Sequence, residues 1–96
     1  MHIVAIVHGG NGAFSVSFPD LPGCVAAGET EQKALEDAAE AMAFHLEGMR
    51  EDGEPIPTPR SIDALRADPE FAVDFAGHAA IALLPFDGAA AVAAAE

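Results

Sequence analysis

Few side chains in this sequence are suited to catalysis, and their spacing argues against it. His45 and Glu47 form an H-x-E pair of the kind found in zinc deaminases, but that chemistry also needs a P-C-x-x-C motif, and Cys24 is the single cysteine. Cys24 could act as a nucleophile with a histidine as its base. A lone cysteine in an apolar segment is more often inert packing, and His45, at the edge of an apolar stripe, is more often a packed histidine.

A metal site is equally poorly supported. The first apolar segment of the chain carries no acid, and the carboxylates cluster on a predicted solvated helix face. His2 and His8 share one face of a predicted strand, but the rise of a strand separates them by about 20 Å, which is too far to hold one ion. We therefore expect no catalytic residue, no metal and no cofactor, and we predict that the protein is not an enzyme.

The charge of the chain indicates the kind of partner that it can bind. Sixteen Asp and Glu residues against four Lys and Arg residues give a formal net charge of −12. Phosphate binding requires cationic side chains, so nucleic acid is a poor partner for this surface. A cationic protein is a good partner, because complementary charge speeds encounter and penalises wrong partners.

The sequence shows neither a targeting signal nor a membrane segment. Ile3–Val7 lacks the basic start and the length of a secretion signal, and the apolar stretch Ala79–Ala95 is interrupted by Pro85, Asp87 and Gly88. A lone cysteine also cannot form an internal disulfide. We expect a cytoplasmic protein that does not associate with membranes.

The elements that would position these side chains begin with a hairpin. His2–His8 is rich in Val and Ile, as in a strand that is covered on both faces, and Ala13–Phe18 alternates apolar and polar residues. The intervening Gly9–Gly12, with the sequence GGNG, tolerates the positive φ of a tight turn. A phosphate-binding loop is the alternative, but it requires a following helix and usually a lysine.

A proline-rich turn then leads to a third short strand, Cys24–Ala27.

A long amphipathic helix is predicted to follow. Thr30 is its expected N-cap, and the helix should end near Asp52, with Gly53 as the stop signal. Its apolar stripe, which should cover one face of the sheet, consists of Leu35, Ala38, Met42, Leu46 and Met49, with Ala34, Ala41 and His45 at the edge. The opposite side carries a set of acids that we call the acidic ridge: Glu36, Glu40, Glu47 and Glu51.

The second half of the chain predicts a connector, a short helix and a last strand. Three prolines between residues 55 and 59 indicate an extended connector. Ser61 can cap a short helix through about Arg66, which Asp68–Pro69 would end, and Ala80–Phe86 has the apolar character of a strand.

Together these elements predict an α+β domain over residues 1–87. Its order is β-β-β-α-β, with one long helix packed on the sheet and one short extra helix before the last strand. Residues 88–96 form an Ala-rich tail without a cap or an amphipathic pattern, so we expect it to fray or to become ordered only on a partner.

Phe44 does not fit the amphipathic pattern of the long helix. It lies roughly 160° around the helix from the apolar stripe, on the same side as Glu51. Either the proline connector folds back over its ring, or Phe44 is an exposed aromatic anchor for another chain.

Five short motifs occur in an order that is typical of one known family. They are SFPDLPGC at residues 17–24, GET at 28–30 with AL at 34–35, HLEG at 45–48 and GEPIP at 53–57. With these motifs, residues 2–86 resemble the HicB antitoxin family, whose amino-terminal domain has the same order of elements.

The resemblance implies a fold and a function. Members of that family resemble an incomplete ribonuclease H fold, and they neutralise a small basic toxin, HicA, which cleaves messenger RNA with a histidine. The resemblance therefore implies a non-catalytic antitoxin that binds and occludes a HicA-type toxin, on a partial ribonuclease H-like sheet. That implication agrees with the acidic charge and with a first strand that lacks metal-binding carboxylates.

The sequence departs from the family pattern at its carboxyl end. Many relatives continue into a helix-turn-helix or ribbon-helix-helix segment that binds the promoter of their own operon. No such motif follows Phe86, and no basic residue stands after it, so operator DNA is not an expected partner of this chain. Either the chain is one of the short, stand-alone relatives, or it is a shortened piece of a longer protein.

Two expectations concern partner binding. The residues expected to contact a partner are Asp20, Leu21, Glu36, Glu40, Phe44 and Glu47. A homo-oligomer is also expected, because an open sheet leaves edge strands that need cover. The alternative function is a protein- or ligand-interaction module of the same fold without a toxin, and a role in RNA binding or cleavage rests on fold analogy alone.

Overall fold

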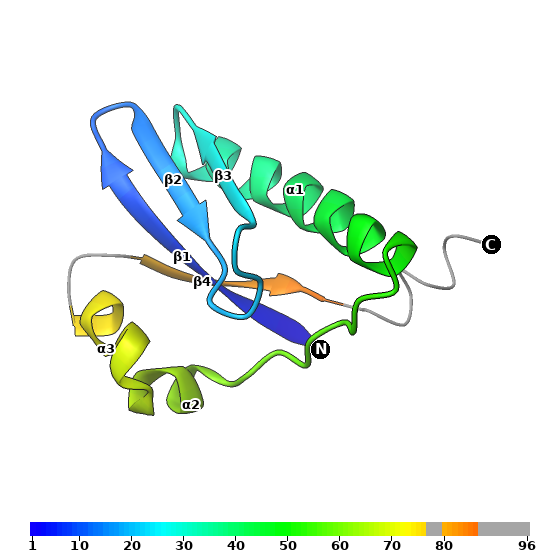
Figure 1. Ribbon diagram of the computed structural model, residues 1–96. Helices are drawn as coiled ribbons and strands as arrows, with labels where there is room; N and C mark the ends of the chain where they lie inside the picture. Colours follow the sequence, from blue (N-terminus) through cyan, green and yellow to red (C-terminus); the bar gives the residue numbers. More distant parts are fainter. Residues whose placement is uncertain (77–79, 87–96) are drawn as a thin grey trace.

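The computed structural model describes residues 1–76 and 80–86, and it begins with the predicted hairpin (Figure 1). Strand β1 (His2–Gly10) pairs antiparallel with β2 (Ala13–Ser17), and the hairpin turns at Asn11 and Gly12, which have φ values of 54° and 82°. An Asn-Gly pair with positive φ at both positions matches the right-handed twist of the flanking strands. The hairpin prediction is confirmed, and β1 runs two residues further than expected because the turn itself needs only two.

The sheet contains four strands in the order β3-β2-β1-β4. Strand β3 (Val25–Gly28) pairs with β2, and β4 (Ala80–Pro85) pairs with β1, both antiparallel. Strand β1 is therefore an inner strand, and all the residues from 3 to 7 are buried. The continuous apolar run of β1 indicated a strand covered on both faces, and the structure confirms it.

Helix α1 (Glu31–Glu51) has the boundaries that its caps predict. The Thr30 hydroxyl accepts a hydrogen bond from the Lys33 backbone N–H at 3.0 Å, and Gly53 ends the helix with a φ of 73°. The helix packs against β2 and β3. Its most buried residues are Ala34, Ala38, Met42 and Leu46, while Leu35, Ala41 and Met49 are partly buried. The stripe is therefore rotated slightly from the predicted one, with Ala34 inside and Leu35 at its edge.

Two short helices, not one, lie between the connector and β4. Helix α2 (Ile62–Ala67) is capped by Ser61, as predicted, and α3 (Pro69–Ala76) follows directly. Asp68 ends α2, but its Oδ1 accepts a hydrogen bond from the Glu70 N–H at 2.9 Å, so the same residue caps α3. Pro69 is the first residue of α3, a position where the missing proline N–H has no intrahelical partner to lose.

These small helices lie away from α1 (Figure 1), and α2 contributes a buried residue that is not part of the main core. Ile3, Ala5 and Val7 belong to the main core beneath α1, whereas Val4 and Ile6, which alternate with them, do not. Leu65 of α2 is fully buried and also lies outside the main core. The predicted tail over residues 88–96, and the predicted domain boundary before it, lie outside the described residues.

Candidate partner-binding surface

Phe44 lies on the outer face of α1, among the acids of the ridge. Its side chain is 80% exposed, so of the two alternatives for Phe44, cover by the proline connector is wrong and exposure is right. Glu40 precedes it by one helical turn and Glu47 follows it by one turn, and both are exposed. Among the described residues, the exposed large hydrophobic side chains are Met1, Val25, Phe44, Val73 and Leu83, of which Phe44 alone is aromatic.

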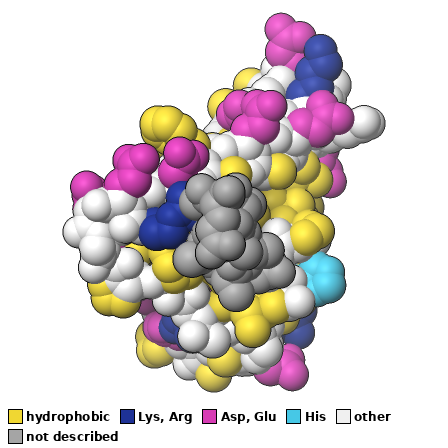
Figure 2. Space-filling view, turned by 90° about the vertical axis from the view of Figure 1, so that its right-hand side faces the viewer, with side chains coloured by type: hydrophobic (Ala, Val, Ile, Leu, Met, Phe, Trp, Pro, Cys, Tyr) yellow, Lys and Arg dark blue, Asp and Glu magenta, His cyan; other side chains and the backbone are white. Residues whose placement is uncertain are grey.

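The acidic ridge has few partners within the described part of the chain. Glu36, Glu40, Glu47 and Glu51 are all exposed, and Glu36 accepts a hydrogen bond of 3.4 Å from the Gln32 side-chain amide. Figure 2 shows acidic side chains gathered along the upper part of the molecule, with hydrophobic side chains between them. An aromatic ring surrounded by carboxylates can bind an apolar pocket whose rim is cationic. The structure thus places four of the six predicted partner residues, Glu36, Glu40, Phe44 and Glu47, on one face.

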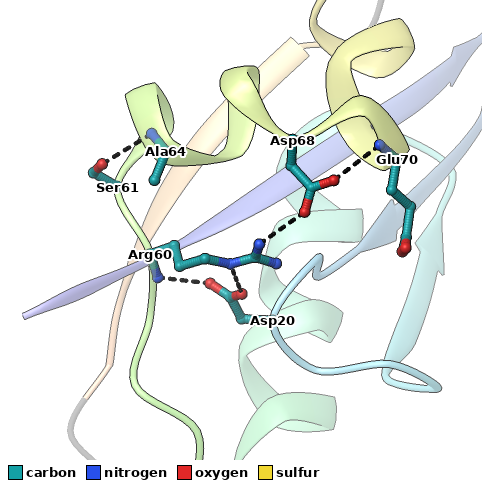
Figure 3. Close-up of polar contacts among 6 residues, drawn as sticks. All are labelled: Asp20, Arg60, Ser61, Ala64, Asp68 and Glu70. Atoms are coloured by element: carbon teal, nitrogen blue, oxygen red, sulfur yellow. Dashed lines mark hydrogen bonds and ion pairs between the residues drawn. The ribbon is translucent and has the colours of Figure 1, made fainter.

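Asp20 and Leu21, the other two predicted residues, lie elsewhere and hold the turn between β2 and β3. Leu21 is 1% exposed and packs in the main core. Its backbone N–H donates to Phe18 and its carbonyl accepts from Cys24, each at 3.1 Å, so the turn is closed by its own backbone. Asp20 accepts two hydrogen bonds of 2.7 Å from Arg60, one from the backbone N–H and one from Nε (Figure 3).

Arg60, which the sequence reasoning did not single out, joins three segments. Besides its bonds to Asp20, Arg60 donates from Nη1 to Asp68 at 3.0 Å (Figure 3). Its guanidinium also lies 5.4 Å from the centre of the Phe71 ring. The hydrogen bond from the Glu70 N–H, and then that from Arg60, lower the pKa of Asp68. Hydrogen bonds to Asp20 and then Asp68 raise the pKa of Arg60. The signal in the sequence was an arginine at the end of the connector, but its main partner, Asp20, lies 40 residues earlier in the chain.

Cys24 and His45, the residues considered for catalysis, lie in surroundings that suit packing better than catalysis. Cys24 is buried in the main core, and burial raises the pKa of its thiol, which disfavours the reactive thiolate. His45 is partly buried and lines an open hollow of about 390 Å³ with Met49, Glu54 and Pro55 among its walls. In the described part of the chain, no three His, Cys, Asp or Glu side chains converge as a metal site would require. No described helix is both long and apolar enough to cross a membrane.

The fold and the sequence identify the class of protein. Residues 2–91 match the family described as the HicB-like antitoxin of bacterial toxin-antitoxin systems, and the chain belongs to that family. It is 44% identical over 48 residues to Antitoxin HicB 1 of Photorhabdus laumondii subsp. laumondii. The aligned residues cover 50% of this chain and 31% of that protein. The chain spans less than half the length of that relative and of a second one, encoded by Haemophilus phage HP1.

Solved structures show the same relationship. The N-terminal domain of Burkholderia pseudomallei antitoxin HicB is 33% identical, with a TM-score of 0.71 over 91% of this chain and 99% of that one. A chain of a HicA3 and HicB3 toxin-antitoxin complex is 26% identical, with a TM-score of 0.70 over 91% of this chain and 99% of that one. The predicted α+β fold and the predicted family are therefore confirmed.

Proposed function

We propose that this chain neutralises a small basic toxin of the HicA type by binding it and covering its RNA-cleaving site. Membership of the HicB-like antitoxins and the similarity to a chain of the HicA3 and HicB3 complex support this proposal. The net charge of −12 favours a cationic partner over an anionic one. The chain takes no part in catalysis, because its one cysteine is buried and its ridge carboxylates point into solvent.

The surface that best fits a toxin is the outer face of α1. The observation that carries this assignment is the 80% exposure of Phe44 among Glu36, Glu40 and Glu47. A large aromatic side chain contributes most of its binding energy once a partner removes it from water, and the surrounding charges mainly set the association rate. The helix is a rigid support for such an anchor, because its opposite side is packed in the core.

The function can be tested with the toxin that a neighbouring basic reading frame would encode. The two proteins should co-purify, and adding one equivalent of this chain should stop RNA cleavage by the toxin in vitro. Co-expression should also restore growth. A complex that forms but still cleaves RNA would exclude occlusion, and toxin that remains free at micromolar concentration would exclude the antitoxin role. Metal-dependent RNA cleavage by this chain alone would contradict the non-catalytic assignment.

A further inference from the structure

Gly48 lies in the last turn of α1, where the fold has no need of a glycine. The stop signal of the helix is Gly53, and Gly48 itself is helical. A Cβ atom built on Gly48 would meet no atom within 4 Å beyond the backbone of the helix. A glycine inside a helix is destabilising relative to alanine. The missing side chain therefore leaves room for an approach from outside the chain.

Gly48 lies between the exposed ring of Phe44 and the hollow at the end of α1. Phe44 precedes it by four residues and His45 by three, and residues at these spacings are neighbours on the surface of a helix. His45 and Met49 line the hollow, which has a volume of about 390 Å³. The shortest path along the helix from Phe44 to the hollow thus crosses Gly48, where no side chain stands in the way.

The hollow is held open by three segments: α1, the turn between β2 and β3, and the connector. The N–H of Glu54 donates to the Met49 carbonyl at 2.8 Å, which fixes the start of the connector on the helix end. The connector then runs back from α1 to the turn, where the Arg60 N–H donates to Asp20 at 2.7 Å (Figure 1). The apolar walls of the hollow are Leu21, Pro22, Met49, Pro55 and Pro57. The fold therefore forms the hollow before a partner arrives.

The charged groups of the hollow are acidic. Asp20 and Glu54 line it, and no Lys or Arg of the described residues does. The Asp20 side chain is 7% exposed and is already paired with Arg60. Glu54 is exposed, and its carboxylate has no hydrogen-bond or ion-pair partner in residues 1–76 and 80–86. A carboxylate beside apolar walls suits a side chain with an aliphatic stem and a cationic head.

We propose that the hollow receives one lysine or arginine side chain of the basic toxin, whose backbone lies over Gly48 while Phe44 inserts into the toxin beside it. The inference rests on the proposed function and adds a specific site to it. The methylene stem packs on Met49 and Pro22, and the cationic head reaches Glu54. Exposed charges on the ridge mainly set the association rate, whereas a charge pair enclosed in a hollow mainly slows dissociation.

The dissociation rate of the toxin complex tests the approach over Gly48. Gly48→Gln fills the gap on the helix, and Ala39→Gln adds the same side chain nine residues earlier, at an exposed position on the opposite side of α1. Gly48→Gln should raise the urea midpoint of the chain, because glutamine favours a helix more than glycine does. It should nevertheless raise the dissociation rate by at least about tenfold. Ala39→Gln should leave that rate unchanged.

The charge in the hollow is tested in the same way. Glu54→Gln should also raise the dissociation rate by about tenfold, whereas Glu29→Gln, which removes an exposed charge away from the hollow, should not. Each Lys and Arg of the toxin is then replaced by Ala and measured against wild type and against Glu54→Gln. One of these toxin positions should be non-additive with Glu54→Gln, as expected for residues in contact.

Three results would overturn the inference. One is a dissociation rate that neither Gly48→Gln nor Glu54→Gln changes while the wild-type complex is tight. Another is an equal increase in the two control variants. The third is that Glu54 couples to no Lys or Arg of the toxin. A wild-type chain that binds no toxin would remove the proposed function and this inference together, so the two failures are distinguishable.

Discussion

At the scale of single residues, exposure separates the side chains that hold the fold from those that can meet a partner. Asp20 and Leu21 lie in a conspicuous sequence motif, yet one bonds Arg60 and the other fills the core. Phe44 belongs to no such motif, and only its departure from the amphipathic pattern of the helix drew attention to it, yet it is exposed. The sequence predicted the anomaly at Phe44, but it could not decide between cover and exposure, because the path of the connector depends on long-range contacts.

Replacing Phe44 with Ala should separate folding from binding. Because the side chain is 80% exposed, the free energy of unfolding in urea should change by less than about 0.5 kcal/mol. The affinity for the toxin should fall by roughly 2 kcal/mol, or about 30-fold, as for a hot-spot residue. Val73→Ala, at a residue that is 72% exposed on α3, is the control and should change neither quantity. A large loss of stability would show that the ring is buried.

The charge on Asp68 should make the stability of the α2 and α3 region depend on pH. Its pKa is lowered in the folded state, so its carboxylate stabilises the fold above the ordinary pKa of about 4, and this contribution is lost as pH falls through the lowered value. Asp68→Asn keeps a capping oxygen but removes the charge that faces Arg60. The variant should be less stable than wild type to urea at about pH 7, and the difference should shrink towards about pH 3. A difference that is constant with pH would contradict this role.

At the scale of elements, boundaries were predictable where the signal is local. Thr30 and Gly53 mark the ends of α1 through their own hydroxyl group and backbone angle, and Ser61 marks the start of α2 in the same way. Helix α3 was missed because Asp68–Pro69 was interpreted only as the end of a helix. The same two residues are also a favourable start, because Asp68 accepts a hydrogen bond from the Glu70 N–H and Pro69 needs no donor at the first helical position. Arg60 also bonds Asp68, from outside the helix.

The junction between β3 and α1 should tolerate no side chain at Gly28. A Cβ atom there would overlap the backbone of Lys33 and Ala34 in the first turn of α1. Gly28→Ala should therefore lower the free energy of unfolding by about 1–3 kcal/mol. Gly48→Ala is the matched control, since a Cβ at Gly48 meets open space and alanine favours the helix by up to about 1 kcal/mol. Urea unfolding of both variants checks this pair, and similar shifts in both would contradict the close packing at Gly28.

At the scale of the whole molecule, charge and topology divide the surface. The acidic ridge lies on the helix that covers β2 and β3, and the uncharged β4 edge lies at the other side of the sheet. Composition predicted a cationic partner, and the element order predicted the fold, because both depend on patterns spread over the chain. The cover of the β3 edge by α1 could not be predicted, because it depends on a hydrogen bond from the Ala27 N–H to the Asp37 carboxylate that only the folded chain forms.

The central claim is that a basic toxin binds to the acidic outer face of α1. The most direct test is the rate at which the toxin associates with a variant that carries fewer charges on this face. Glu36, Glu40 and Glu47 are replaced together by Gln, which preserves helix propensity. A control variant removes three other exposed charges, by Glu29→Gln, Asp63→Asn and Glu70→Gln. Stopped-flow mixing with the toxin, over a range of ionic strength, compares both variants with wild type.

The ridge variant should associate roughly tenfold more slowly at low salt, with a deficit that shrinks as the Debye length falls to about 8 Å near physiological strength. The control variant has the same net charge and should associate at close to the wild-type rate. If the ridge variant binds at the wild-type rate, or if both variants slow equally, the toxin does not bind at the outer face of α1.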